Sequence, residues 1–203
     1  MRKLAIPELL KQEFATVEAV WNSAAETRRV DALILSWTKY EKQLRRLFCF
    51  LIYQHPKINA EQVKKVIDIL AENRYLYPHT FIDGIKKLGV ASVPDLLAGR
   101  YQELSPEITR IREYRNKLIH GQITGQSIKS ERLESDVILI VDWITTLANA
   151  AQTKFGYDGL RRNTFLNAKK TSGIAVAKYP FNSVAELRNW LNTLTQKPNK
   201  KPS

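Results

Sequence analysis

The stretch LILSWTKYEKQLRRLFCFL, residues 33–51, decides the fold class of this chain. Its large apolar side chains recur at intervals of three and four residues, at Leu33, Trp37, Tyr40, Leu44, Leu47 and Leu51. This spacing is that of an α-helix with one buried face. The stretch therefore predicts a long helix from about Arg28 to Gln54, ended by His55-Pro56.

Weaker forms of the same pattern occur along the first 156 residues. They predict helices over about 7–26, from the N-cap Asn59 to Leu70, over 80–88, from Ser105 to Gly121, and from about Ser135 to Phe155. A further short turn opens at Ser92, and the polar residues 121–134 are expected to form a loop. We expect an all-α chain in which at least four antiparallel helices form one bundle over residues 1–156.

Residues 157–196 differ from the bundle because they are strongly basic. From residue 156 onward there are nine Lys or Arg and two acidic residues, so +7 of the net charge of +12 lies there. We expect a small basic C-terminal appendage with a short helix that begins at Ser183 and docks on the bundle. Residues 174–177 are expected to be a strand or extended chain, and residues 197–203 to be disordered.

Composition excludes several kinds of site. The lone Cys49 lies in an apolar run, which excludes a disulfide framework or a cysteine zinc site within one chain and predicts a buried, inert thiol. His55 and His79 have no acidic or histidine neighbours at ligand spacing, and no glycine-rich nucleotide motif occurs. We therefore expect no metal and no cofactor. No apolar segment is long enough for a signal peptide or a membrane span, which favours the cytoplasm.

The charge of +12 and the sequence pI of about 9.8 favour a polyanionic partner. A basic surface that serves solubility, or that binds an acidic protein, is the alternative. Residues 85–97 are similar to a helix-hairpin-helix, which binds nucleic-acid backbone. The usual second glycine of that motif is absent, so an ordinary connection between two helices is favoured.

The segment RNKLIH, residues 115–120, ends the helix that is predicted to begin at Ser105. The apolar seam of this helix continues at Arg115, where a buried guanidinium needs a carboxylate, a phosphate or water. Alternatively the seam runs through Tyr114, and Arg115 lies at the rim with its stem packed. His120 can stabilise the end of the helix dipole or act as a functional imidazole, with Asn116 one turn earlier to hold its ring.

The same segment matches the R-N-x-x-x-H form of the motif of the HEPN superfamily, and the chain resembles that superfamily over about residues 5–155. Trp37, Tyr40, Glu41, Leu44 and Arg45 also resemble the early long helix of HEPN domains. The resemblance implies metal-independent RNA cleavage, in which the ribose 2′-hydroxyl attacks the adjacent phosphate and leaves a 2′,3′-cyclic phosphate and a 5′-hydroxyl. It also implies a homodimer whose two motifs face one cleft. Such a dimer suits the geometry, because residues five apart lie about 140° apart on a helix.

On this resemblance the catalytic residues are Arg115, His120 and Asn116. His120 would serve as general base or acid, Arg115 would clamp phosphate oxygens, and Asn116 would orient His120 or contact phosphate. We expect the RNA-binding residues to be basic, with Tyr157 and Phe165 as possible stacking partners. They are Lys117, Arg112, Arg161, Arg162, Lys169 and Lys170.

The resemblance suggests a toxin or an antiviral defence effector, restrained by an antitoxin or another defence protein. HEPN toxins that are silenced by a nucleotidyltransferase carry a Tyr two residues after the His, and this chain has Gln122 there. A different antitoxin, or a role in phage defence, is therefore favoured. The alternative to an enzyme is a HEPN-like module that binds RNA or a protein without catalysis.

Overall fold

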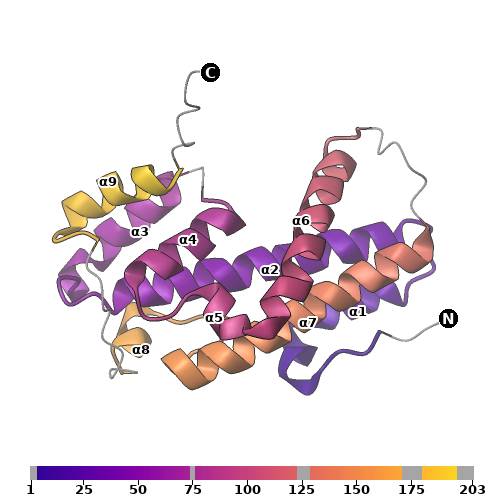
Figure 1. Cartoon of the computed structure of the whole chain (residues 1–203), viewed down its shortest axis with the longest axis horizontal. Helices are drawn as coiled ribbons and strands as arrows, with labels where there is room; N and C mark the ends of the chain where they lie inside the picture. Colours follow the sequence, from indigo (N-terminus) through magenta and orange to yellow (C-terminus); the bar gives the residue numbers. More distant parts are fainter. Residues whose placement is uncertain (1–3, 74–75, 123–128, 171–179, 196–203) are drawn as a thin grey trace.

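The computed structural model describes residues 4–73, 76–122, 129–170 and 180–195 (Figure 1). Within these ranges all regular secondary structure is helical, which confirms the all-α class. In chain order the elements are η1 (Glu8–Leu10), α1 (Lys11–Trp21), α2 (Arg28–Tyr53), η2 (Ala60–Gln62), α3 (Val63–Glu72), α4 (Pro78–Leu88), α5 (Val93–Leu97), α6 (Gly99–Ile119), α7 (Ser130–Phe155), α8 (Phe165–Lys170) and α9 (Val184–Thr195).

Helix α2 is the central element, and it contacts α1, α4, α7 and α8. Its bounds agree with the sequence prediction to within one residue. All six apolar residues that predicted it are buried, because three sides of the helix are covered by its neighbours. At the centre of the core, the rings of Trp37, Tyr40 and Trp143 contact one another in sequence, with centroid separations of 4.9 and 5.7 Å.

The expected antiparallel arrangement holds for α1 and α2 and is wrong for α2 and α7. Arg29 at the start of α2 pairs with Glu134 near the start of α7, at 2.9 Å. Further along both helices, the Gln43 side chain donates to the carbonyl of Ile144 at 3.0 Å. The two longest helices therefore run parallel, as Figure 1 shows. The intervening α3 to α6 carry the chain back to the end of the molecule where α2 begins.

Two predicted helix starts are also wrong. Helix α6 begins at Gly99 rather than Ser105, so Pro106 lies inside the helix instead of in its first turn. Helix α7 begins at Ser130 rather than Ser135, and its polar first turns reach the core through the buried Leu133. In both cases a polar or proline-containing stretch looks like a loop in sequence but is held helical by its packing.

Several other residues that the sequence predicted to begin or end helices do so in the structure. Asn59 and Ser92 each form a reciprocal capping box with the side chain three residues later. Gly89 and Gly156 end α4 and α7 with positive φ angles of 76° and 70°. At these positions a left-handed backbone is required, which glycine adopts without strain. Helices α4 and α5 are thus joined by an ordinary short connection.

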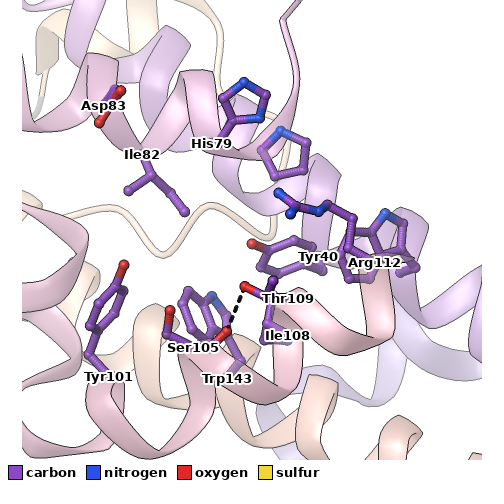
Figure 2. A pocket seen from close by; sticks show the side chains of 12 residues that line it. Tyr40, His79, Ile82, Asp83, Tyr101, Ser105, Ile108, Thr109, Arg112 and Trp143 are labelled. Atoms are coloured by element: carbon purple, nitrogen blue, oxygen red, sulfur yellow. Dashed lines mark hydrogen bonds between the residues drawn. The ribbon is translucent and has the colours of Figure 1, made fainter. Parts of the chain in front are cut away.

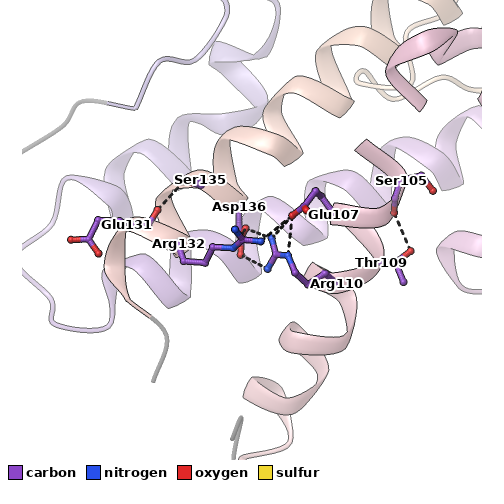
Figure 3. Close-up of polar contacts among 8 residues, drawn as sticks. All are labelled: Ser105, Glu107, Thr109, Arg110, Glu131, Arg132, Ser135 and Asp136. Atoms are coloured by element: carbon purple, nitrogen blue, oxygen red, sulfur yellow. Dashed lines mark hydrogen bonds and ion pairs between the residues drawn. The ribbon is translucent and has the colours of Figure 1, made fainter. Parts of the chain in front are cut away.

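An ionic network joins α6 to α7 (Figure 3). Its centre is Asp136, whose side chain is completely buried. Arg110 binds Asp136 through both guanidinium nitrogens and also binds Glu107, with Nε donating at 2.9 Å. Arg132 reaches the same two carboxylates at 3.1 and 3.6 Å. Because α6 has only three buried residues, this network is a large part of what fixes it to the bundle.

The C-terminal segment is built onto the far end of α2. Gln54 donates to the carbonyl of Ala168 in α8 at 2.6 Å, and α9 packs on α3 and α4. The short helix expected from Ser183 is confirmed, with the Ser183 hydroxyl accepting from the amide of Glu186. The buried side chains of α9 belong to the same hydrophobic cluster as the bundle. The expectations for 174–177 and 197–203 fall outside the described residues.

No helix in the described part of the chain combines the length and the apolar character that a membrane span requires. Cys49 lines a cavity between α2, α3 and α4, and burial raises the pKa of its thiol to about 11. At neutral pH the thiol is therefore protonated and a poor nucleophile, as predicted, although Cys49 is half-buried rather than fully buried.

The contact between α2 and α4 requires a glycine at position 84. A Cβ built there would lie 2.3 Å from the ring of Phe48, which is itself fixed between Phe81 and Trp190. We expect Gly84→Ala to lower the free energy of unfolding by about 1 to 3 kcal/mol, because the ring has no room to move away. Gly99→Ala is the control, since a Cβ there meets nothing within 4 Å. Urea unfolding of both variants measures this, and equal stability of the two would contradict it.

Candidate functional site

The RNKLIH segment forms the last turns of α6, which ends at Ile119 as the sequence predicted to within two residues. The end is closed by a Schellman motif around Gly121, whose φ is +61°. The Gly121 amide donates to the carbonyl of Leu118 at 3.2 Å, and the Gln122 amide donates to that of Lys117 at 2.9 Å. These bonds fix the backbone of His120, the C-cap residue.

The end of α6 extends beyond the body of the bundle. No residue of α6 after Ile111 is buried, and Asn116, Lys117 and His120 are exposed. The apolar side chain of Ile119 is 45% exposed. Figure 1 shows the last turns of the helix rising away from α2 and α7. One side of the motif, with His120, is therefore presented to solvent, whereas Arg115 and Leu118 on the other side are partly buried.

Arg115 combines the two alternatives that its sequence position left open. Its side chain is 25% exposed and continues the apolar seam toward α2, where it lies 6.0 Å above the ring of Trp37. A carboxylate oxygen of Glu41 is 4.0 Å from its Nη2. Glu41 also accepts from the indole nitrogen of Trp37 at 2.8 Å. The guanidinium is thus half-buried at the rim, with an acidic partner on α2.

The remaining motif residues are not arranged as the sequence suggested. The amide oxygen of Asn116 accepts from Nη1 of Arg115 at 2.9 Å instead of holding the ring of His120. Among the described residues, no hydrogen bond joins the His120 ring to Arg115 or Asn116. Arg115 faces α2, whereas His120 faces solvent, in keeping with their separation of about 140° around the helix. One chain alone therefore does not bring the two residues together.

Two neighbouring phenols are unsuited to act as bases. Burial raises the pKa of Tyr114 to about 12, and the nearby carboxylate of Asp136 adds to the rise. Burial also raises the pKa of Tyr40 well above its usual range. Both phenols remain protonated near neutral pH. In this region they can donate hydrogen bonds but cannot accept a proton from a ribose hydroxyl.

The predicted RNA-binding residues fall into two groups. Arg112 and Lys117 lie on α6 beside the motif. Arg161 and Arg162 are exposed between α7 and α8, and Lys169 and Lys170 belong to α8 itself. That second group lies at the end of α2 near Gln54, which is 13 residues or about 20 Å along the helix from Glu41. The described backbone of the second group is thus distant from the motif along α2.

The aromatic residues beside the second group are largely structural. Tyr157 is only 7% exposed and stacks on Phe50 in the core, and its hydroxyl bonds the carbonyl of Arg161. The expectation that Tyr157 stacks on RNA is therefore wrong. Phe165 is half-buried, with its ring set edgewise against Tyr53. The rings of Tyr157 and Phe165 thus attach the C-terminal segment to α2.

A cleft of about 220 Å³ opens between α4 and α6, beside the motif (Figure 2). No local sequence pattern indicates the cleft as a whole, because its lining comes from four helices, α2, α4, α6 and α7, that meet in the fold. Its lining residues are Trp37, Tyr40, Pro78, His79, Ile82, Asp83, Tyr101, Ser105, Ile108, Thr109, Arg112 and Trp143. Of the residues predicted to contact RNA, Arg112 is in this lining. One signal was present in the sequence, since positions 101, 105, 108 and 112 share a helix face.

His79, one residue before the helix that the sequence predicts over 80–88, occupies the first turn of α4, after Pro78. Its ring is exposed and stacks near Tyr77. His55, by contrast, is buried and stacked on Phe181 at 4.2 Å, which makes it part of the core. In the described ranges, no group of three or more His, Cys, Asp or Glu side chains is placed to hold a metal ion.

Comparison with protein-family models, curated proteins and solved structures gave no match to this chain, so the site is described from its own residues alone.

Proposed function

We propose that this chain is a metal-independent endoribonuclease of the HEPN type. The ribose 2′-hydroxyl attacks the adjacent phosphorus, the 5′-oxygen leaves, and the products end in a 2′,3′-cyclic phosphate and a 5′-hydroxyl. His120 transfers a proton in this step. Arg115 stabilises the charge on the phosphate oxygens, and Asn116 positions the Arg115 guanidinium to which it is bonded.

The observation that carries the proposal is the placement of the R-N-x-x-x-H segment at the solvent-exposed end of α6. A histidine that only stabilises a helix end needs no neighbouring arginine and asparagine. Here Arg115 and Asn116 form a bonded pair, and His120 stands exposed one turn beyond them. The net charge of +12 is consistent with an RNA substrate.

The proposed active species is a homodimer with a composite site. Because Arg115 and His120 lie on different sides of α6, a phosphate held by Arg115 needs the His120 of a second chain. The exposed end of α6 offers the surface for such pairing, including the apolar Ile119. In the cell we propose a toxin or antiviral defence effector. Its restraining partner would differ from a nucleotidyltransferase, since Gln122 replaces the tyrosine that such a partner modifies.

One observation favours the alternative of a non-catalytic HEPN-like module that binds RNA or a protein. Arg115 is already engaged by Glu41 at 4.0 Å, so a phosphate has to compete with this carboxylate. For a module that only binds, the affinity for RNA would fall steeply as the salt concentration rises, and no new RNA ends would form.

The test is to incubate the purified full chain with total RNA in the presence of EDTA and to analyse the product ends. We expect EDTA-resistant cleavage that yields 2′,3′-cyclic phosphate and 5′-hydroxyl termini. Binding without any cleavage would favour the non-catalytic module. Cleavage that requires a divalent metal would exclude the proposed mechanism.

A further inference from the structure

The cleft between α4 and α6 has the shape and chemistry of a subsite. One wall is a single face of α6, formed by Tyr101, Ser105, Ile108, Thr109 and Arg112. The facing wall is the first turns of α4. Figure 2 shows the Arg112 side chain extending from α6 toward the α4 side, where His79 lies. Polar groups from two elements therefore converge on one small space, as in most ligand sites.

The end of the cleft at Arg112 and His79 favours an anion. Arg112 is half-buried and, among the described residues, makes no ion pair, so its charge is not compensated by a carboxylate. The first turn of α4 has no side-chain cap and adds the positive end of the helix dipole, although Pro78 at its start has no N–H to donate. Asp83 lines the cleft one turn after His79, and its carboxylate suits a hydroxyl donor rather than a phosphate.

The other end of the cleft is aromatic. The ring of Tyr101 is half-buried and lies 5.9 Å from that of Trp143, which is 1% exposed. The indole Nε1 of Trp143 is buried without an acceptor among the described residues. Because the faces of Trp37 and Tyr40 are covered by the core, Tyr101 is the ring that a planar ligand can stack against.

The size of the cleft limits the ligand. At about 220 Å³ it is smaller than the roughly 300 Å³ or more of a pocket for a drug-sized molecule. A single nucleobase with its sugar and phosphate matches both the space and the order of groups, with an aromatic ring at one end and a guanidinium at the other.

The cleft is also in register with the motif. Arg112 precedes Arg115 by one helical turn, about 4.5 Å along α6. Trp37 lines the cleft and lies under the Arg115 guanidinium. A strand whose phosphate lies at Arg115 therefore has its next nucleotide beside Arg112.

We propose that this cleft binds one ribonucleotide, with its base against Tyr101 and its phosphate between Arg112 and the start of α4. In RNA, this nucleotide is the neighbour of the one whose phosphate is cut. That this nucleotide neighbours the cut phosphate rests on the proposed function, whereas nucleotide binding in the cleft does not. Arg112 and Tyr101 are thus binding residues that select and hold the strand beside the reacting phosphate.

The experiment is calorimetric titration of the full chain with each of the four ribonucleoside 3′-monophosphates and with inorganic phosphate. We expect Arg112→Gln to weaken binding of the tightest nucleotide about tenfold or more, because a charge-assisted hydrogen bond is lost. Tyr101→Ala should weaken it to a similar extent through lost stacking, about tenfold. Lys154→Gln removes the same charge from an exposed site at the end of α7 and is the matched control, with unchanged affinity.

The outcomes separate this site from the proposed function. His120→Ala should bind the nucleotides as tightly as the wild type, because His120 lies outside the cleft. On RNA, Arg112→Gln should raise KM more than it lowers kcat. A wild-type chain that binds nucleotides here but cuts no RNA would remove the proposed function and leave the subsite. Unchanged nucleotide affinity in both Arg112→Gln and Tyr101→Ala, or equal affinity for inorganic phosphate, would overturn the subsite.

Discussion

His120→Ala is expected to reduce the rate of RNA cleavage by about a thousandfold, the middle of the range for loss of a general acid or base. Arg115→Ala should reduce it by about a hundredfold or more, because the charge on the phosphate oxygens loses its bidentate partner. Cleavage of a labelled RNA in EDTA measures both rates. Gln122→Ala is the control, since Gln122 is exposed in the same helix cap and its backbone hydrogen bond is kept.

The two inactive variants can also test the composite site when they are mixed. If Arg115 and His120 of different chains act together, a mixed dimer has one intact site. Random pairing then restores about one quarter of the wild-type rate. No restoration would place both residues of a working site on the same chain. Full cleavage by each variant alone would remove the proposed mechanism altogether.

The second large effect concerns stability. Arg110→Met is expected to lower the free energy of unfolding by about 2 to 3 kcal/mol, since it leaves the buried carboxylate of Asp136 with Arg132 alone, at 3.6 Å. This is less than for a fully buried pair, because the Arg110 side chain is 34% exposed and partly screened by water. Urea unfolding, with both the midpoint and the slope recorded, measures the change.

Arg100→Met is the matched control for this prediction. Arg100 also joins α6 to α7, through Asp142, and like Arg110 it has a glutamate partner three residues away on α6. Its side chain is 47% exposed and that of Asp142 is 37% exposed, so water screens the pair and its loss should change the unfolding midpoint little. Similar losses in the two variants would show that burial of Asp136 does not decide the stability of this contact.

The helices that could be predicted are those whose own residues carry the signal. The period of three and four residues located α2 to within one residue, and the side chains of Asn59 and Ser92 marked helix starts that the structure confirms. The predicted start of α6 was wrong because Pro106 resembles a proline in the first turn of a helix. In the structure Pro106 is exposed inside the helix, and Leu104 before it is buried and keeps the earlier turn packed.

The site was less predictable because its partners come from other helices. The spacing within α6 indicated that Arg115 would need a carboxylate or lie at the rim, but not that Glu41 supplies this carboxylate from α2. The direction of α7 relative to α2 depends on the path of the chain between them. The spacing of apolar residues does not predict that path. The cleft likewise required α4 to lie opposite Tyr101 and Arg112, a tertiary fact that no local pattern contains.

Beyond Ile111 and the Arg110–Asp136 pair, the end of α6 is held on its inner side alone, where Tyr114, Arg115 and Leu118 are partly buried against the bundle. From Ile111 to His120 this segment of the helix is about 14 Å long. A tilt of about 10° about Ile111 therefore moves its end by about 2 Å. Productive placement of catalytic groups tolerates only about 0.5 Å. On the proposed function, a partner chain or bound RNA that contacts the exposed side of this helix end reduces its freedom to tilt, and in that way acts as a switch.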